Sequence, residues 1–526
     1  MGNKTSFIIS IFLVMLMVGC GNLKRIIDQP VFIAGGNNGR ADNNCHKEFE
    51  AVPSAVTNPS GDIAWFASYG TNRMTYAKGS WSNWAAGSSD LSGSGFAVEE
   101  NPQGPLSLNM LTGDSWTAYS ESKNLAFFYF IGRYTDSAGK RSSCVSVAAT
   151  TPEKLELGEW DFPAACISEQ SADQGAILHI DATNTFYAAS KLGRSIVIQA
   201  FDNCPGAPGP LYGCPETSRK TISSLGLAEG LRFSLAENPC TGNLILTYKK
   251  DKEVRLRFYD ENLNTINEYV VRKNQPFEAE PAQTNVGCVK GTIRRCGLGG
   301  SDCCNPDTDD CRDNAPTTCL RDNGRPSIDT YQQIFNGSPI CGAVVAYDVM
   351  VEGEDGNLWS KSRLDVVDVT SEESPSIISH NQSTSDKFTW NQYMSYAVVS
   401  DNGPNTKKPK IAWFWLTDIR GPCNLIVEGM TSENLGGKME PTGIISGPFP
   451  GVFMSSYGIG DYFRGMKGGD KDGSLYLSWG EPVKSPGCVS CMGDEWNLST
   501  KITRIRWEKI KDPELKNKLP DPILIK

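Results

Sequence analysis

The sequence predicts an all-β protein, most simply a seven-bladed β-propeller. Three observations lead to this prediction: a strand pattern that returns seven times, a composition with 52 glycines and 30 prolines among 526 residues, and the near absence of helical periodicity. Turn-forming residues at this density, together with 39% hydrophobic and 10% aromatic residues, favour many short strands around a large core.

The repeated pattern is a turn with Gly, Asn or Lys, then a branched or leucine residue, then alternating aromatic and apolar positions. Successive copies start 62, 60, 59, 113, 54 and 63 residues apart, so one interval is about double the others. A period near 60 residues fits a four-stranded unit with long loops, which buries its faces only against neighbouring units in a ring. The copies are SGDIAWFAS from Ser60, SKNLAFFYF from Ser122, ATNTFYAAS from Ala182, TGNLILTY from Thr241, EDGNLWSKS from Glu354, KPKIAWFWL from Lys408 and KDGSLYLSW from Lys471.

Seven copies predict seven blades, although six or eight also fit the spacing. The double interval has room for a degenerate blade, and the two ends of the chain could share one. Residues 501–507 (KITRIRW) alternate as a strand does, so we expect them to close the ring against an N-terminal strand such as residues 31–34. A tandem of β-sandwiches with similar turns is the alternative architecture.

The first twenty residues have the form of a secretory signal. Lys4 supplies a positive charge, and the apolar run 7–18 is too short to span a bilayer comfortably. Residues 17–20 (MVGC) resemble the lipobox of bacterial lipoproteins, which implies cleavage before Cys20 and a membrane tether through a lipid on Cys20. The alternative is an uncleaved anchor, or an ordinary signal peptide with a chance cysteine. Gly21 in place of aspartate favours the outer membrane and leaves the periplasmic face and the cell surface both open.

The expected organisation follows from the signal, the repeats and a cysteine-rich stretch. We predict a lipoprotein signal peptide (1–19), a tether with an N-terminal strand (20–50), propeller blades (51–287), a cysteine-rich insertion (288–319), further blades (320–510) and a polar C-terminal tail (511–526).

Charge and cysteine usage narrow the partners and the compartment. The formal net charge is -10 and no Lys/Arg run exceeds a triplet, which argues against nucleic acid as a partner. Beyond Cys20, 16 of the 17 cysteines remain, an even number that could pair into eight disulfides in an oxidising envelope.

The cysteine-rich stretch contains six cysteines with an adjacent pair at its centre. This framework resembles the inhibitor cystine knot of secreted proteins, and the resemblance implies the pairs Cys288–Cys304, Cys296–Cys311 and Cys303–Cys319, one of the fifteen pairings that six cysteines allow. So few large apolar side chains occur there that disulfides would have to replace a core. The adjacent pair argues against zinc.

Further cysteines and aspartates are weaker site candidates. Cys204 and Cys214 bracket a proline-glycine loop that a disulfide would stiffen, and Cys488 and Cys491 have a thioredoxin-like spacing without the expected helix. We expect no cofactor unless calcium binds within residues 307–310, where Asp307, Asp309 and Asp310 offer oxygen ligands. A solvated acidic loop is the favoured interpretation, because the glycine and the bidentate glutamate of a calcium loop are missing.

The segment 410–482 carries a second resemblance. Its sequences IAWFWLTDIRG, SSYGIGDYFRGM and KDGSLYLSWGEP are similar to the last blades of bacterial sialidase-like propellers with BNR repeats. The resemblance implies a propeller fold and puts forward Arg420, Asp461, Tyr462 and Arg464 as catalytic candidates. The start of the sialidase active site and an intact Asp box are absent, so the fold carries over better than the chemistry.

Two functions follow as expectations. The first is a cell-envelope lipoprotein whose propeller is a binding scaffold for a glycan or a protein, with Trp81, Trp84 and Trp116 available to stack on sugars. The second is a glycoside hydrolase of sialidase type. Only three histidines occur, and His179 lies in an alternating run that predicts a strand residue and not a base.

Overall fold

The computed structural model describes most strands of the chain and the shorter turns between them. The described residues are 23–35, 52–57, 63–69, 73–79, 81, 91–96, 107–120, 122–135, 141–157, 159–168, 175–192, 194–202, 216–225, 233–273, 293–294, 303–304, 311–312, 326–352, 358–383, 392–400, 409–418, 425–449, 463–467, 474–484 and 496–509.

Among the described residues, seven antiparallel sheets of four or five strands follow one another along the chain, and each is one blade; an eighth sheet of three short strands lies between the fourth and fifth blades in sequence. Blade 1 has β3 (Val52–Thr57), β4 (Ile63–Tyr69), β5 (Arg73–Gly79) and β6 (Leu91–Phe96); blade 2 has β7 (Ser107–Ser120), β8 (Leu125–Thr135), β9 (Arg141–Thr150) and β10 (Phe162–Ser168), with the helix α3 (Pro152–Leu157) between its last two strands. Blade 3 has β11 (Gly175–Ile180), β12 (Thr185–Leu192), β13 (Ser195–Asp202) and β14 (Glu216–Ile222); blade 4 has β15 (Phe233–Glu237), β16 (Leu244–Lys250), β17 (Glu253–Tyr259) and β18 (Thr265–Arg272).

The remaining blades complete the set. Blade 5 has β22 (Ser327–Phe335), β23 (Ser338–Glu352), β24 (Leu358–Asp368) and β25 (Ser376–Gln382); blade 6 has β26 (Gln392–Val399), β27 (Ile411–Asp418), β28 (Leu425–Ser432) and β29 (Glu440–Phe449). Blade 7 has β30 (Phe463–Lys467), β31 (Leu475–Lys484) and β32 (Trp496–Lys509), and its outer positions are taken by β1 (Leu23–Ile27) and β2 (Val31–Gly35).

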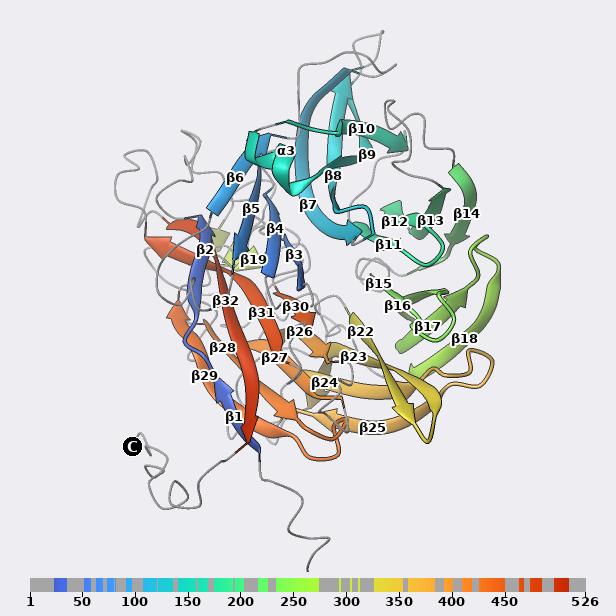
Figure 1. Cartoon of the computed structure of the whole chain (residues 1–526), viewed down its shortest axis with the longest axis vertical. Helices are drawn as coiled ribbons and strands as arrows, with labels where there is room; N and C mark the ends of the chain where they lie inside the picture. The colour runs from blue at the N-terminus through green and yellow to red at the C-terminus, as the bar shows by residue number, and fades with distance from the viewer. Residues whose placement is uncertain are drawn as a thin grey trace, which may run out of the picture.

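The first strands of the blades form a closed ring. Each first strand contacts the first strand of the next blade, from β3 through β7, β11, β15, β22, β26 and β30 and back to β3. Figure 1 shows these strands around one centre, with the later strands of each blade farther out. The predicted seven-bladed propeller is therefore confirmed.

The ring is closed by strands from the two ends of the chain. The register pairs Val31 with Ile502 and Phe32 with Lys501, which confirms the predicted closure of 501–507 against the N-terminal strand. A second pairing, Leu23 with Lys509, adds β1 to the same edge. Figure 1 shows the blue β1 and β2 beside the red β32. The N-terminal strands thus complete the last blade.

Six of the seven repeat copies lead into the second strand of a blade, but the copy at Glu354 does not. It leads into β24, the third strand of blade 5. The second strand, β23, follows a turn at Asn336 and Gly337, whose φ angles of 49° and 82° suit asparagine and glycine. In blade 5 the pattern therefore matches a different strand, because an aspartate-glycine sequence also precedes β24. The double interval contains no further four-stranded blade among the described residues; the small strands β19 (Ile293–Arg294), β20 (Cys303–Cys304) and β21 (Cys311–Arg312) lie there.

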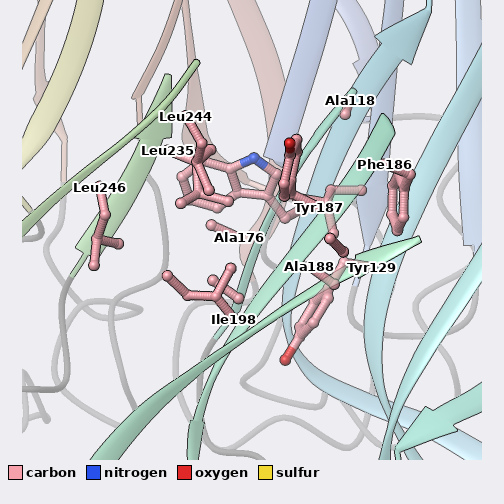
Figure 2. Close-up of a cluster of buried hydrophobic side chains, with 14 of the residues drawn as sticks. Ala118, Tyr129, Ala176, Phe186, Tyr187, Ala188, Ile198, Leu235, Leu244 and Leu246 are labelled. Carbon is pink, nitrogen blue, oxygen red and sulfur yellow. The ribbon is translucent and has the colours of Figure 1, made fainter. Parts of the chain in front are cut away.

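Large apolar side chains fill the spaces between neighbouring blades. One buried cluster joins blades 2, 3 and 4, and Figure 2 shows Tyr129, Phe186, Tyr187 and Leu244 within it. Separate buried clusters join blades 4 and 5, blades 5 and 6, and blades 6 and 7. Radial packing of this kind holds the ring rigid and leaves its two faces available for loops.

Among the described residues no helix is long and apolar enough to cross a membrane.

The two faces of the ring differ in their connections. We call the turn face the side on which the first and third strands of every blade end, and the crossover face the side on which each fourth strand leads to the next blade. Leu23 lies on the turn face, because it is opposite Lys509 at the end of the third strand of blade 7. The connection 274–325, which holds the predicted cysteine-rich insertion, leaves from the crossover face after β18.

A disulfide joins blades 4 and 5 beside the turn face. Cys240, in the first turn of blade 4, is bonded to Cys341 on β23, across a sequence separation of 101 residues. Cys144 is also in a disulfide. No local cysteine pattern in the sequence indicates that Cys240 pairs with Cys341, because 101 residues separate them.

Replacing both partners, Cys240→Ala with Cys341→Ala, is expected to lower the free energy of unfolding by about 2–5 kcal/mol, because the crosslink constrains a long loop of the unfolded chain. Urea denaturation of the double variant measures the loss. Non-reducing peptide mapping of the unaltered chain provides the control, and finding Cys240 and Cys341 in separate unlinked peptides would contradict the assignment.

Candidate functional site

The junction between blades 4 and 5 gathers an unusual number of charged side chains. Side chains alternate along a strand, so Lys361, Arg363 and Asp365 project from the same side of β24. Val367 continues this row and belongs to the apolar cluster packed on blade 4. The row therefore faces blade 4, and its polar part lies on the crossover side of the apolar cluster. We call Lys249, Arg272, Lys361, Arg363 and Asp365 the junction cluster.

Asp365 is the centre of the junction cluster. Its side chain is fully buried, and it accepts a hydrogen bond of 2.6 Å from the Tyr347 hydroxyl. Arg272, at the end of β18 in blade 4, lies with Nε 3.2 Å from Oδ2. His380 Nδ1, on the neighbouring strand β25, is 2.5 Å from Oδ1. One carboxylate thus joins three elements from two blades.

The pKa shifts around Asp365 follow from burial and from its charge. Burial, then the Asp365 charge and hydrogen bond, raise the pKa of Tyr347 well above its ordinary value, so this phenol stays protonated and donates. Burial alone would lower the pKa of Arg272, but pairing with Asp365 outweighs burial and raises it. Arg272 therefore stays charged.

Cations outnumber Asp365 in the junction cluster. Burial lowers the pKa of Arg363, and the nearby charge of Arg272 lowers it further. Arg363 Nε is buried and has no hydrogen-bond partner among the described residues. Burial also lowers the pKa of Lys361 to about 8, against an opposing effect of Glu428. Lys249 reaches across from β16, with Nζ 3.4 Å from the Asp348 carbonyl oxygen.

At the neighbouring junction, between blades 3 and 4, the partly buried arginine side chains are each paired with a carboxylate. Arg255 contacts Glu253 at 2.7 Å and Glu268 at 2.6 Å, and Arg257 also pairs with Glu268. Each guanidinium there has a carboxylate partner, so the group has a structural explanation. At the junction of blades 4 and 5, Asp365 contacts Tyr347, Arg272 and His380, and Arg363 adds a further guanidinium on the same side of β24. Two guanidinium groups beside one carboxylate are suited to an anion.

Access to the junction cluster comes from its half-exposed members. Arg272 and Arg363 are partly exposed, and Lys249 and Lys361 are buried. The side chain of His380, which lies next to the cluster, is 45% exposed. Tyr269 on β18 is partly buried beside the cluster, and its pKa is raised by burial and by the Asp365 charge. Guanidinium groups beside an aromatic ring can bind a carboxylate and stack on a sugar ring. Within the described part of the chain, no group of three or more His, Cys, Asp or Glu side chains is placed to hold a metal ion.

The catalytic candidates from the sequence fall largely outside the described residues. Arg420, Asp461 and Tyr462 lie there, and Arg464 is described only by its backbone, near the start of β30 and opposite Ser478. Its position on a first strand places Arg464 beside the centre of the ring at the crossover face. The sequence did not predict the junction cluster. Only the alternation of Lys361, Arg363 and Asp365 could have indicated that charged side chains share one side of a strand.

Several other candidates also lie outside the described residues. They are the lipidation site Cys20, the cysteines Cys204, Cys214, Cys288, Cys296, Cys319, Cys488 and Cys491, and the aspartates Asp307, Asp309 and Asp310. Cys303, Cys304 and Cys311 are described by their backbone alone, in a small antiparallel sheet where Cys304 is opposite Cys311. The predicted disulfide pairs of this insertion stay predictions.

Two of the proposed sugar-stacking residues are unavailable. Trp81 is buried, with Tyr476 at 5.9 Å between ring centroids and the Arg504 guanidinium over its ring. Trp116 is buried in the apolar cluster of blades 2 to 4. The expectation of stacking was wrong for both, because the space between blades takes up large rings; Trp84 lies outside the described residues.

His179 is a strand residue, as the sequence predicts. It lies on β11, buried and stacked on Phe127 with 5.6 Å between ring centroids. Burial lowers its pKa, and Asp181 opposes that effect only in part, so the neutral ring is favoured. Asp181 itself accepts hydrogen bonds from the Ser120 and Ser122 hydroxyls, at 2.7 and 2.6 Å. Neither interaction leaves His179 as an accessible base.

Comparison with known proteins gives distant structural likeness only. No family model and no curated protein matches the chain. Among solved structures, an α-L-arabinofuranosidase from Fusarium graminearum has 10% identity and a TM-score of 0.38, covering 90% of this chain and 97% of its own. An α-L-arabinanase from Penicillium chrysogenum has 11% identity and a TM-score of 0.35, covering 91% and 98%. The NanB sialidase from Streptococcus pneumoniae has 9% identity and a TM-score of 0.35, covering 74% and 67%.

Removing the buried charge, with Asp365→Asn, is expected to lower the free energy of unfolding by about 3 kcal/mol, because Arg272 and Arg363 would then face each other without a carboxylate. Urea denaturation measures this loss. The matched control is Lys438→Gln in the exposed pair Lys438–Glu440, which we expect to change stability by less than about 0.5 kcal/mol. Equal effects of the two substitutions would contradict the central position of Asp365.

Proposed function

We propose that this chain is a cell-envelope lipoprotein whose propeller binds an anionic carbohydrate at the junction cluster. The observation that carries the proposal is the pair of partly exposed guanidinium groups, Arg272 and Arg363, beside the buried carboxylate of Asp365. The half-exposed Arg272 and Arg363 would contact the anionic group, and the buried lysines would add positive potential. The lipid on Cys20 would hold the propeller at the membrane.

Features around the junction cluster support a carbohydrate over a simple ion. Tyr269 and His380 offer ring surfaces beside the guanidinium groups, and sugars commonly lie on such rings. The two blades that carry the cluster are joined by the Cys240–Cys341 disulfide and by the Arg272–Asp365 pair, so the site is held rigid before the ligand arrives. The oxidised state of Cys144, Cys240 and Cys341 is consistent with an envelope compartment.

Arg363→Gln is expected to weaken binding of a carboxylated oligosaccharide by about tenfold, because the loss of one charge-assisted contact is worth roughly 1.4 kcal/mol. A glycan array identifies the ligand, and calorimetry measures the affinity. The matched control is Arg219→Gln, since Arg219 pairs with Glu216 on the outer strand of blade 3, away from the cluster.

Two further readouts separate an anionic ligand from a neutral one. The carboxyl-reduced oligosaccharide should bind weakly, and the affinity for the acid should fall as pH rises through about 8, where Lys361 loses its charge. Equal affinity for the acidic and the reduced oligosaccharides, or an unchanged affinity in Arg363→Gln, would contradict the proposal.

Glycoside hydrolysis of sialidase type is the second candidate function. The observation that favours it is the place of Arg464 on β30, beside the centre of the crossover face, in a segment that resembles sialidase-like propellers. The junction cluster itself is poorly suited to hydrolysis, because two carboxylates are needed and its one described carboxylate, Asp365, already accepts three hydrogen-bonded or ionic partners.

The hydrolase is tested with fluorogenic sialosides and arabinosides on the mature chain. If it is correct, turnover should be found and should fall at least about a hundredfold in Arg464→Gln, as removal of a group that stabilises transition-state charge would require. Arg219→Gln serves as the control and should retain full turnover. Absence of turnover on all the glycosides, with binding retained, would exclude this candidate in favour of the binding protein.

A further inference from the structure

Exposed apolar side chains mark the turn face of the propeller. Ile334 and Phe335 lie at the tip of the hairpin between β22 and β23 and are 62% and 60% exposed. Leu157, at the end of α3 between the third and fourth strands of blade 2, is 73% exposed. These three side chains bury little of their apolar surface in the propeller, so its own packing does not explain them.

The chain also begins its first strand on the turn face. Leu23 is opposite Lys509 at that end of blade 7, and only Gly21 and Asn22 lie between Cys20 and Leu23. Three residue-to-residue steps span at most about 11 Å when fully extended. A lipid on Cys20 would therefore hold the turn face close to the membrane surface.

The anchor and the apolar side chains are distributed around the ring. The anchor belongs to blade 7, Leu157 to blade 2, and Ile334 and Phe335 to blade 5. In Figure 1, β1, α3 and the β22–β23 hairpin lie on different sides of the centre. Three contact points around one face define a plane, so this face could lie flat on a bilayer.

From this geometry we propose that the turn face rests on the lipid surface, with Ile334, Phe335 and Leu157 in the headgroup layer; the inference depends on the lipid anchor proposed above. Side chains at hairpin tips and helix ends can enter the interfacial layer, where water and headgroups remain available to the backbone groups of the turn or helix end. The crossover face, with the junction cluster opening toward it, is then directed away from the bilayer.

The charge of the exposed side chains on the turn face indicates which lipid headgroups this face can approach. The turn-face connections carry exposed carboxylates, among them Glu153, Asp181, Glu261 and Glu373. Carboxylates at a membrane surface are repelled by anionic headgroups. The surface that fits is therefore zwitterionic, such as phosphatidylethanolamine or phosphatidylcholine.

The test uses the lipidated full-length chain on phosphatidylethanolamine–phosphatidylcholine vesicles, with the photoreactive residue p-benzoylphenylalanine in place of Phe335, Leu157 or Ile444. Ile444 is the matched control: it is 60% exposed, as Phe335 is, but lies in the middle of the outer strand β29. Lipid adducts are quantified by mass spectrometry. We expect at least about fivefold more adduct at positions 335 and 157 than at 444, and less adduct when phosphatidylglycerol is added.

The outcomes separate this inference from the proposals it rests on. Equal adduct at positions 335, 157 and 444 on a chain whose Cys20 carries the lipid would overturn the orientation and leave the anchor intact. An N-terminal peptide without lipid would overturn both the anchor and the orientation. Crosslinks from position 335 to protein in place of lipid would also overturn the orientation. Glycan binding at the junction cluster is measured independently.

Discussion

The pairing of β32 with strands from the other end of the chain is the interaction on which the rest of the structure depends. β32 is opposite β1 through Leu23 and Lys509 and opposite β2 through Val31 and Ile502, so one long strand carries both N-terminal strands. Asp28, between β1 and β2, adds an ion pair of 2.7 Å to Arg504. Arg25 extends the closure to blade 6, where it donates to Thr431 at 2.7 Å and to the Pro441 carbonyl at 2.8 Å. A propeller has exposed edges wherever its ring is open, and these contacts remove the last of them.

The junction between blades 4 and 5 has a second structural demand. The chain leaves the ring after β18 and returns at β22, so these neighbours are not joined by a short connection. Beside the turn face, the Cys240–Cys341 disulfide joins them, and Glu372 accepts hydrogen bonds from Asn238 and Thr241 of blade 4, at 2.7 and 2.6 Å. Toward the crossover face, Arg272 and Asp365 join them. The junction is thus held together toward both faces, and the proposed ligand-binding site belongs to its crossover end.

The sequence predicted the fold well because blade strands have a local pattern. A turn residue followed by alternating large apolar positions identified the second strand of six blades, and the alternation of 501–507 identified the closing strand. In blade 5 the pattern identified β24, since the aspartate-glycine sequence before β24 is similar to the asparagine-glycine sequence of the turn before β23. A local pattern cannot show which of two similar turns opens the second strand.

The candidate site was much less predictable, because its members meet only in the folded ring. Arg272 and Asp365 are far apart in sequence, as are Cys240 and Cys341, and nothing local indicates that either pair is in contact. The burial of individual side chains could not be predicted from the sequence either. Trp81 and Trp116 are of a residue type common on sugar-binding surfaces, but they fill space between or within blades. The catalytic candidates Arg420, Asp461 and Tyr462 depend on a family resemblance and stay predictions.

Amide hydrogen exchange of the mature chain tests the closed ring most directly. Peptides that cover residues 23–35 and 496–509 are compared by mass spectrometry over minutes to hours. If the N-terminal strands complete blade 7, both peptides should be protected together and should lose protection together on addition of denaturant. Free exchange of residues 23–35 beside a protected β32 would contradict the account, since the ring would then be open at its last blade.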